Sequence, residues 1–157
     1  MKEVATDFEK MTGRKYGLFE TYRLEDAEIA IVVMSSAAGT TKDIIDQYRD
    51  KGIKAGLLKP RMFRPFPYLE IADALKHLKA IAVLDRADSF GGYGPLFMEI
   101  SSAVMSMDTN PAMINKIFGL GGRDYLPDQA EQVLDELVKA AKTGKVQTVK
   151  EYIGVRE

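Results

Sequence analysis

The sequence of 157 residues contains no cysteine and only one histidine, His77. Without cysteine the chain cannot form a disulfide framework, a thiolate metal site or protein ligands for an iron–sulfur cluster. A single histidine also argues against histidine-based zinc sites and most histidine-dependent catalytic triads. The composition therefore leaves few residue types with which this chain could perform catalysis.

An excess of charge and a long hydrophobic run are also missing. The 22 basic residues balance 23 acidic ones, so the formal net charge is -1 and offers no field for nucleic acid or anionic lipid. The longest apolar run, residues 29–34, is too short to span a bilayer, and the charged N-terminus does not resemble a signal peptide. We expect a cytoplasmic protein with no nucleic-acid and no membrane partner.

The chain does have the pattern of an alternating strand and helix fold. The run IAIVVM at residues 29–34 is continuously apolar, as in a strand that is covered on both faces. Further strands are predicted within residues 54–63, at residues 80–85 and within residues 112–122. Helices are predicted between and after them, and such alternation favours an α/β fold with three layers, α/β/α, around a mainly parallel sheet.

The helix predictions depend on apolar spacing and on residues that start or stop helices. Thr40 with Asp43 suggests a capping box that opens a helix ending near Gly52. Pro67 and Pro127 suit the first positions of two further helices. Apolar residues at helical spacing extend the helix after Pro67 to Leu78 and the helix after the glycine turn to Met107.

Three segments follow from these patterns. Residues 1–28 are predicted to form an N-terminal amphipathic helix, stopped by Gly13, and an extended linker arm. Residues 29–143 form the α/β domain. Residues 144–157 could add an edge strand or act as a docking tail, and the sequence leaves both possibilities open.

Four loops are expected at the carboxyl ends of the strands, where open α/β sheets bind ligands: SSAAGTTK, RMFRPFP, DRADSFGGYGP and GLGGRDYLP. None matches the phosphate-binding P-loop or the dinucleotide fingerprint, because the glycine spacings differ. Asp85 and Asp88 could act as acid and base or hold magnesium, but no nucleophile elbow or other catalytic motif accompanies them. We therefore assign no catalytic residue and no metal ligand.

The loops nevertheless carry charged and glycine residues that could meet a ligand or another protein surface. The loop RMFRPFP ends a run, residues 51–69, that has five cations and no acid, and this run could receive a phosphate or an acidic neighbour. The glycine turn is expected to face another domain or subunit. The candidate interface or ligand-edge residues are Arg61, Arg64, Asp85, Arg86, Asp88, Gly91, Gly92, Arg123 and Asp124.

Four stretches in order carry a family resemblance: GRKYGLFETYRLEDAEIAIVVMSSAAGT, AGLLKPRMFRPFP, AIAVLDRADSFGGYGPLF and GLGGRD. Together they resemble the C-terminal part of the α chain of pyruvate:ferredoxin oxidoreductase, a 2-oxoacid:ferredoxin oxidoreductase, over about residues 13–151. The resemblance implies a fold like the transketolase C-terminal domain. It also implies a holoenzyme that oxidatively decarboxylates pyruvate to acetyl-CoA and reduces ferredoxin.

In that family the chemistry uses thiamine diphosphate, magnesium, iron–sulfur clusters and coenzyme A, and the resemblance implies that this domain binds none of them. The chain is expected to be part of a longer α chain, inactive alone, with a structural and assembly role. Its partners would be the remainder of the α chain and the other oxidoreductase subunits, and ferredoxin through the holoenzyme. The alternative is a stand-alone coenzyme A- or nucleotide-binding α/β module that uses the basic run and the glycine turns.

Overall fold

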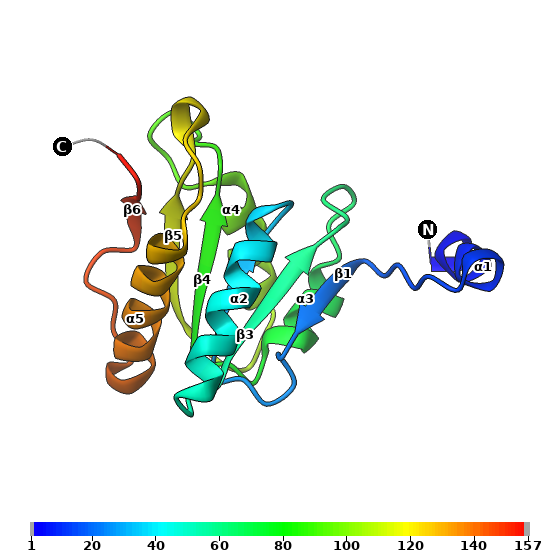
Figure 1. Cartoon of the computed structure of the whole chain (residues 1–157), viewed down its shortest axis with the longest axis horizontal. Coiled ribbons are helices and arrows are strands. Elements are labelled where there is room, and N and C mark those ends of the chain that lie inside the picture. Colours follow the sequence, from blue (N-terminus) through cyan, green and yellow to red (C-terminus); the bar gives the residue numbers. More distant parts are fainter. Residues whose placement is uncertain (1, 156–157) are drawn as a thin grey trace.

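A six-stranded sheet in the order β1-β3-β2-β4-β5-β6 forms the centre of the molecule (Figure 1). The structure is a computed structural model that describes residues 2–155. All neighbouring strands pair in parallel except β1, which pairs with β3 in antiparallel fashion. The strands are β1 Phe19–Tyr22, β2 Ile29–Val33, β3 Ala55–Pro60, β4 Ala80–Asp85, β5 Ala112–Ile117 and β6 Lys150–Tyr152.

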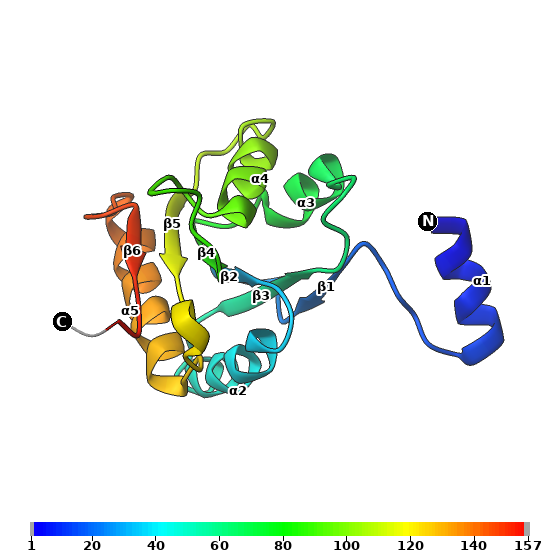
Figure 2. The same ribbon diagram turned by 90° about the horizontal axis from the view of Figure 1, so that it is seen from above.

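Helices cover both faces of this sheet (Figure 2). One face carries α2, Ala37–Asp50, and α5, Pro127–Thr143, and the other carries α3, Tyr68–Leu75, and α4, Pro95–Val104. A short 3₁₀ helix, Leu120–Gly122, follows β5. This arrangement confirms the predicted three-layer α/β/α fold. Among the described residues, no helix combines the length and the apolar character needed to cross a membrane.

The unbroken apolar runs of β2 and β4 have a direct structural cause, because every residue of both strands is buried. Ile29, Ile31 and Val33 contact the core beneath α2 and α5, whereas Ala30 and Val32 contact the core beneath α3 and α4. Each fully buried valine or isoleucine side chain stabilises the fold by about 1.5–3 kcal/mol. The two central strands therefore supply much of the hydrophobic stabilisation of both layers.

The strand order creates a topological switch point between β2 and β4. From β2 the chain crosses to β3 on one side, and after α3 it returns to β4 on the other side. The loops that leave the carboxyl ends of β2 and β4 therefore diverge, and in open α/β sheets such a point leaves a crevice.

The first helix, α1 Lys2–Thr12, stands away from the sheet in both views (Figures 1 and 2). Gly13 follows it at φ 70°, a backbone conformation that favours glycine, so the predicted helix and its stop are confirmed. The arm after it differs from the prediction, because Phe19–Tyr22 form β1 at the edge of the sheet. The arm has no clear periodicity because all four residues of this strand are half-buried.

Two helix starts also differ from the prediction. The predicted capping box at Thr40 is wrong, since α2 already begins at Ala37 and Thr40 lies within its first turn. Ser35 turns the chain directly after β2 with φ 61°, which lets Ala37 and Ala38 pack into the core. Pro67 precedes the first residue of α3 instead of occupying it.

Helix ends and the C-terminal segment complete the comparison with the prediction. The helices α3 and α4 end at Leu75 and Val104, short of the predicted limits at Leu78 and Met107. Leu78 is still buried in the core, so its place in the apolar spacing reflects packing beyond the helix end. Of the two possibilities for the tail, the structure has the edge strand, with β6 parallel to β5.

Candidate functional site

The glycine loop, which we define as residues 86–94, connects β4 to α4 at the carboxyl edge of the sheet. Asp85, the last residue of β4, is only 5% exposed, and its carboxylate caps the helix. One oxygen accepts a hydrogen bond from the backbone N–H of Leu96 at 2.7 Å, and the other accepts from the N–H of Phe97 at 3.1 Å. Asp85 therefore satisfies donors at the start of α4 that have no partner within the helix.

Asn115 on β5 joins Asp85 to the end of the glycine loop. Its side-chain amide donates to the Asp85 carboxylate at 3.0 Å and to the carbonyl of Val83 at 3.2 Å. Its oxygen accepts from the backbone N–H of Gly94 at 2.9 Å. Burial raises the pKa of Asp85, whereas the hydrogen bonds from Leu96, Phe97 and Asn115 oppose that rise. Asp85, which was predicted to face a ligand or another protein surface, thus makes its hydrogen bonds within this domain.

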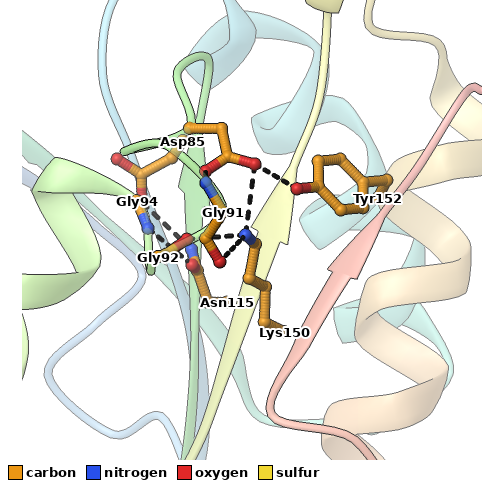
Figure 3. A network of polar contacts seen from close by, with 8 residues as sticks. Asp85, Gly91, Gly92, Gly94, Asn115, Lys150 and Tyr152 are labelled. Carbon is orange, nitrogen blue, oxygen red and sulfur yellow. Dashed lines mark hydrogen bonds and ion pairs between the residues drawn. The ribbon is translucent and has the colours of Figure 1, made fainter.

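Asp88 fixes the other half of the loop through three partners, Gly91, Lys150 and Tyr152, which are labelled in Figure 3. It accepts from the backbone N–H of Gly91 at 2.9 Å, from Lys150 Nζ at 3.1 Å and from the Tyr152 hydroxyl. Lys150 Nζ also donates to the carbonyls of Gly91 and Gly92, at 3.0 and 2.6 Å. We call Asp88, Lys150 and Tyr152 the C-terminal clasp, because it ties β6 to the glycine loop.

Replacing Asp88 with asparagine is expected to loosen the clasp without unfolding the domain. The Tyr152 hydroxyl and Lys150 hold the pKa of Asp88 below its ordinary value of 3.8, so its stabilising effect is present above that pH. It is lost only as the pH falls through the lower, folded-state pKa. Hydrogen exchange at pH 7 should show lower protection factors in β6 for Asp88→Asn, while the wild-type protection factors, corrected for the intrinsic exchange rate at each pH, should stay constant between about pH 5 and pH 8. Unchanged exchange in the variant would contradict this role.

The clasp fixes the base of a loop whose tip exposes an aromatic ring. Phe90 has a relative exposure of 110% and a positive φ of 49°, which is unusual for a bulky residue. Tyr93, close by in sequence, is 43% exposed and contacts the Phe97 ring with centroids 5.0 Å apart. A fixed loop therefore presents Phe90 to solvent. Phe90 was not among the residues predicted from the sequence to meet a ligand or partner.

A cavity of about 520 Å³ lies at the topological switch point, below the loops that follow β2, β4 and β5. Its polar lining includes Ser35, Ser36, Arg86, Arg123 and Asp124. The structure thus brings together four of the predicted candidates: Asp85, Arg86, Arg123 and Asp124. The Arg86 guanidinium reaches the carbonyl of Arg123 at 3.4 Å, which links the loops after β4 and β5.

The other two arginine candidates lie on the loop after β3 and do not line this cavity. Arg61 pairs with Glu20 at 2.6 Å and Arg64 pairs with Glu99 at 2.7 Å. Two of the five cations in the basic run are therefore already paired with carboxylates of this chain. The run seen in the sequence is less free to receive an external anion than its composition indicates.

A fully buried lysine is the main polar feature that sequence reasoning missed. Lys116 on β5 is 0% exposed, and its ammonium group contacts Glu136 of α5 at 2.6 Å and Glu151 of β6. Lys116 thereby connects the edge strand β6 to the helix α5. The available signal was the pair Asn115 and Lys116 inside an otherwise apolar strand, since polar residues there need buried partners.

Among residues 2–155 there is no group of three histidine or acidic side chains that could hold a metal ion. The carboxyl edge instead combines an open cavity, two arginines and a fixed aromatic loop. These features define an α/β domain suited to binding a ligand or docking on another protein surface.

Comparison with known proteins gives the family. The model described as "Pyruvate:ferredoxin oxidoreductase core domain II" matches residues 27–130, and the chain belongs to this family. It is 42% identical to "Pyruvate synthase subunit PorA" of Pyrococcus furiosus, covering 98% of this chain and 39% of that protein. It is 38% identical to "Ketoisovalerate oxidoreductase subunit VorA" of Pyrococcus horikoshii, covering 93% of this chain and 37% of that one. The chain spans about two fifths of the length of these relatives. The resemblance inferred from the motifs is confirmed.

Two solved structures share the fold. A chain of the 2-oxoglutarate:ferredoxin oxidoreductase from Magnetococcus marinus, solved with 2-oxoglutarate, coenzyme A and succinyl-CoA bound, superposes with a TM-score of 0.57. It is 16% identical, and the match covers 78% of this chain and 20% of that chain. An inactive β4 tetramer of a split-gene transketolase gives a TM-score of 0.55 at 12% identity, covering 83% of this chain and 43% of that chain. These likenesses confirm the predicted transketolase-like fold.

Proposed function

We propose that this chain is a non-catalytic assembly domain of the α subunit of a pyruvate:ferredoxin or related 2-oxoacid:ferredoxin oxidoreductase. The observation that carries the proposal is the glycine loop. Internal hydrogen bonds fix its base, and its tip exposes Phe90 completely. Exposed aromatic side chains on a fixed backbone are typical anchors of protein interfaces, since little conformational freedom is lost on binding.

The identity to PorA and VorA supports the choice of holoenzyme. In that holoenzyme pyruvate is oxidatively decarboxylated to acetyl-CoA and ferredoxin is reduced. Thiamine diphosphate, magnesium, the iron–sulfur clusters and coenzyme A would be bound outside this domain. Its direct partners are then the remainder of the α chain and the other subunits, in the cytoplasm.

The N-terminal helix also supports an assembly role. It lies beyond the β1 edge of the sheet, whereas the glycine loop is tied to β6 at the other edge (Figure 1). An isolated helix of 11 residues is marginally stable in water, yet α1 leaves Val4 at 66% and Met11 at 84% exposure. The rings of Phe8 and Tyr16, with centroids 5.5 Å apart, join it to the arm. We expect the apolar stripe of α1 to pack against the remainder of the α chain, with residues 1–28 acting as a connecting segment.

Replacing Phe90 with aspartate tests the proposal. The variant should weaken capture of the remainder of the α chain by tenfold or more, because removing a buried aromatic anchor costs about 2 kcal/mol or more. The measurement is co-purification from cells that co-express this chain, tagged, with the other parts of a PorA-type enzyme. The thermal midpoint of the chain alone should not fall, since Phe90 makes no buried contact there.

Met105→Asp is the matched control for Phe90→Asp. Met105 is 87% exposed but follows α4 at its far end, away from the carboxyl edge. The Met105→Asp variant should capture the remainder of the α chain as well as the wild-type chain does. Equal capture by wild type and Phe90→Asp, or equal losses in both variants, would contradict docking through the glycine loop.

A further inference from the structure

The cavity at the switch point has an apolar wall and a polar rim. Val33 and Leu84, at the ends of β2 and β4, line it together with Leu96 of α4 and Phe118 after β5. Ser35, Ser36 and Thr40 contribute hydroxyl groups on the α2 side. Its volume of about 520 Å³ lies in the range of small-molecule sites.

The two arginines of the rim differ from the other arginines in the body of the domain. Within the described part of the chain, neither Arg86 nor Arg123 forms an ion pair with a carboxylate. Their polar contacts are with backbone carbonyls, at 3.4 Å from Arg86 to Arg123 and at 3.2 Å from Arg123 to Leu120. By contrast, each of the following has a carboxylate partner: Arg23, Arg49, Arg61 and Arg64.

Two carboxylates, Asp85 and Asp124, also line the cavity, but among the described residues neither is paired with these arginines. The Asp85 carboxylate lines the cavity but is engaged with the amides of α4 and with Asn115. Asp124 is exposed and makes no ion pair with either arginine among residues 2–155. The helix α2, 14 residues long, begins at the cavity wall with Ala37, and Ser36 does not cap it with its side chain. The positive end of its dipole therefore adds to the two arginines.

We propose that this cavity binds a phosphate monoester that carries an apolar or aromatic group. Guanidinium groups form paired, charge-assisted hydrogen bonds with phosphate, and the start of α2 offers further positive potential. The apolar wall of Val33, Leu84 and Phe118 fits the remainder of such a ligand. The site is separate from the proposed assembly function, because it involves the cavity lining and does not include Phe90.

The test is a ¹H–¹⁵N NMR titration of the chain with inorganic phosphate and with AMP, at constant ionic strength. Saturable shifts are expected at residues 35–40, at residue 86 and at residues 119–126, with tighter binding of AMP because its base can cover the apolar wall. Arg86→Gln and Arg123→Gln should each weaken AMP binding by about tenfold or more, as expected for one lost charge-assisted hydrogen bond. The spectra themselves report whether each variant is folded.

Two further variants make the test specific. Arg86→Lys keeps the charge but not the paired donors, so it should recover only part of the lost affinity. Lys54→Gln removes an exposed cation at the opposite edge, beside Glu28 and Lys79, and should change nothing. Shifts that rise linearly without saturation, or that persist in both glutamine variants, would overturn the proposal. Assembly measured with Phe90→Asp would be untouched by that result.

Discussion

Replacing Gly94 with alanine is expected to destabilise the domain by at least about 3 kcal/mol, at the upper end of single substitutions. Gly94 has φ −61° and ψ 146°, which alanine adopts freely, so the cost is steric. An added Cβ would overlap the Asp85 carboxylate carbon. That carboxylate cannot yield without losing its bonds to Leu96 and Phe97, which would leave buried donors unpaired. Urea unfolding followed by circular dichroism measures the loss.

Gly39→Ala is the control for Gly94→Ala. Gly39 lies inside α2, and a Cβ there would meet nothing within 4 Å. Alanine at an open helical position should stabilise the protein by about 0.5–1 kcal/mol. If Gly94→Ala were as stable as wild type, Asp85 would not be held in the place that caps α4.

Replacing Lys116 with methionine is expected to cost about 2–3 kcal/mol. Breaking a fully buried ion pair typically costs about 3–5 kcal/mol, because the remaining charge loses its partner. Here the ammonium group is fully buried, but the Glu136 and Glu151 side chains are 30% and 39% exposed, so water can partly compensate. Methionine fills much of the same volume, which keeps cavity formation small. Urea unfolding at pH 7 measures the difference.

A compensating variant separates charge from packing at this position. In Lys116→Met with Glu136→Gln and Glu151→Gln, no unpaired carboxylate remains, so most of the lost stability should return. If Lys116→Met alone were as stable as wild type, desolvation of the ammonium group would already cancel its attraction to the two carboxylates. Failure of the triple variant to recover would locate the cost in packing.

The layers of the fold were predictable because they depend on local patterns. The apolar run of β2 and the stripes of α4 and α5 follow from burial on one or two faces, which the sequence shows directly. The edge strand β1 was not predictable in this way. Its four residues are all half-buried and pair with β3 some 40 residues later, so no alternation marks them.

The candidate site was predictable in position but not in detail. The glycine turn and the loop with Arg123 were expected at the carboxyl edge, where the structure has them. The roles of individual residues depend on partners distant in sequence, such as Asn115 for Asp85 and Lys150 for Asp88. No local pattern encodes such pairs. Only the polar residues within the apolar strand β5 indicated that buried partners exist.

Turnover per assembled complex tests the non-catalytic assembly role most directly. The other parts of a PorA-type enzyme would be reconstituted with wild-type chain or with Phe90→Asp, and pyruvate-dependent ferredoxin reduction would be divided by the amount of complex. The assembly role predicts less complex for Phe90→Asp, unchanged turnover per complex, and no activity of this chain alone. A variant that assembles fully but loses turnover, or activity of the chain alone, would contradict it.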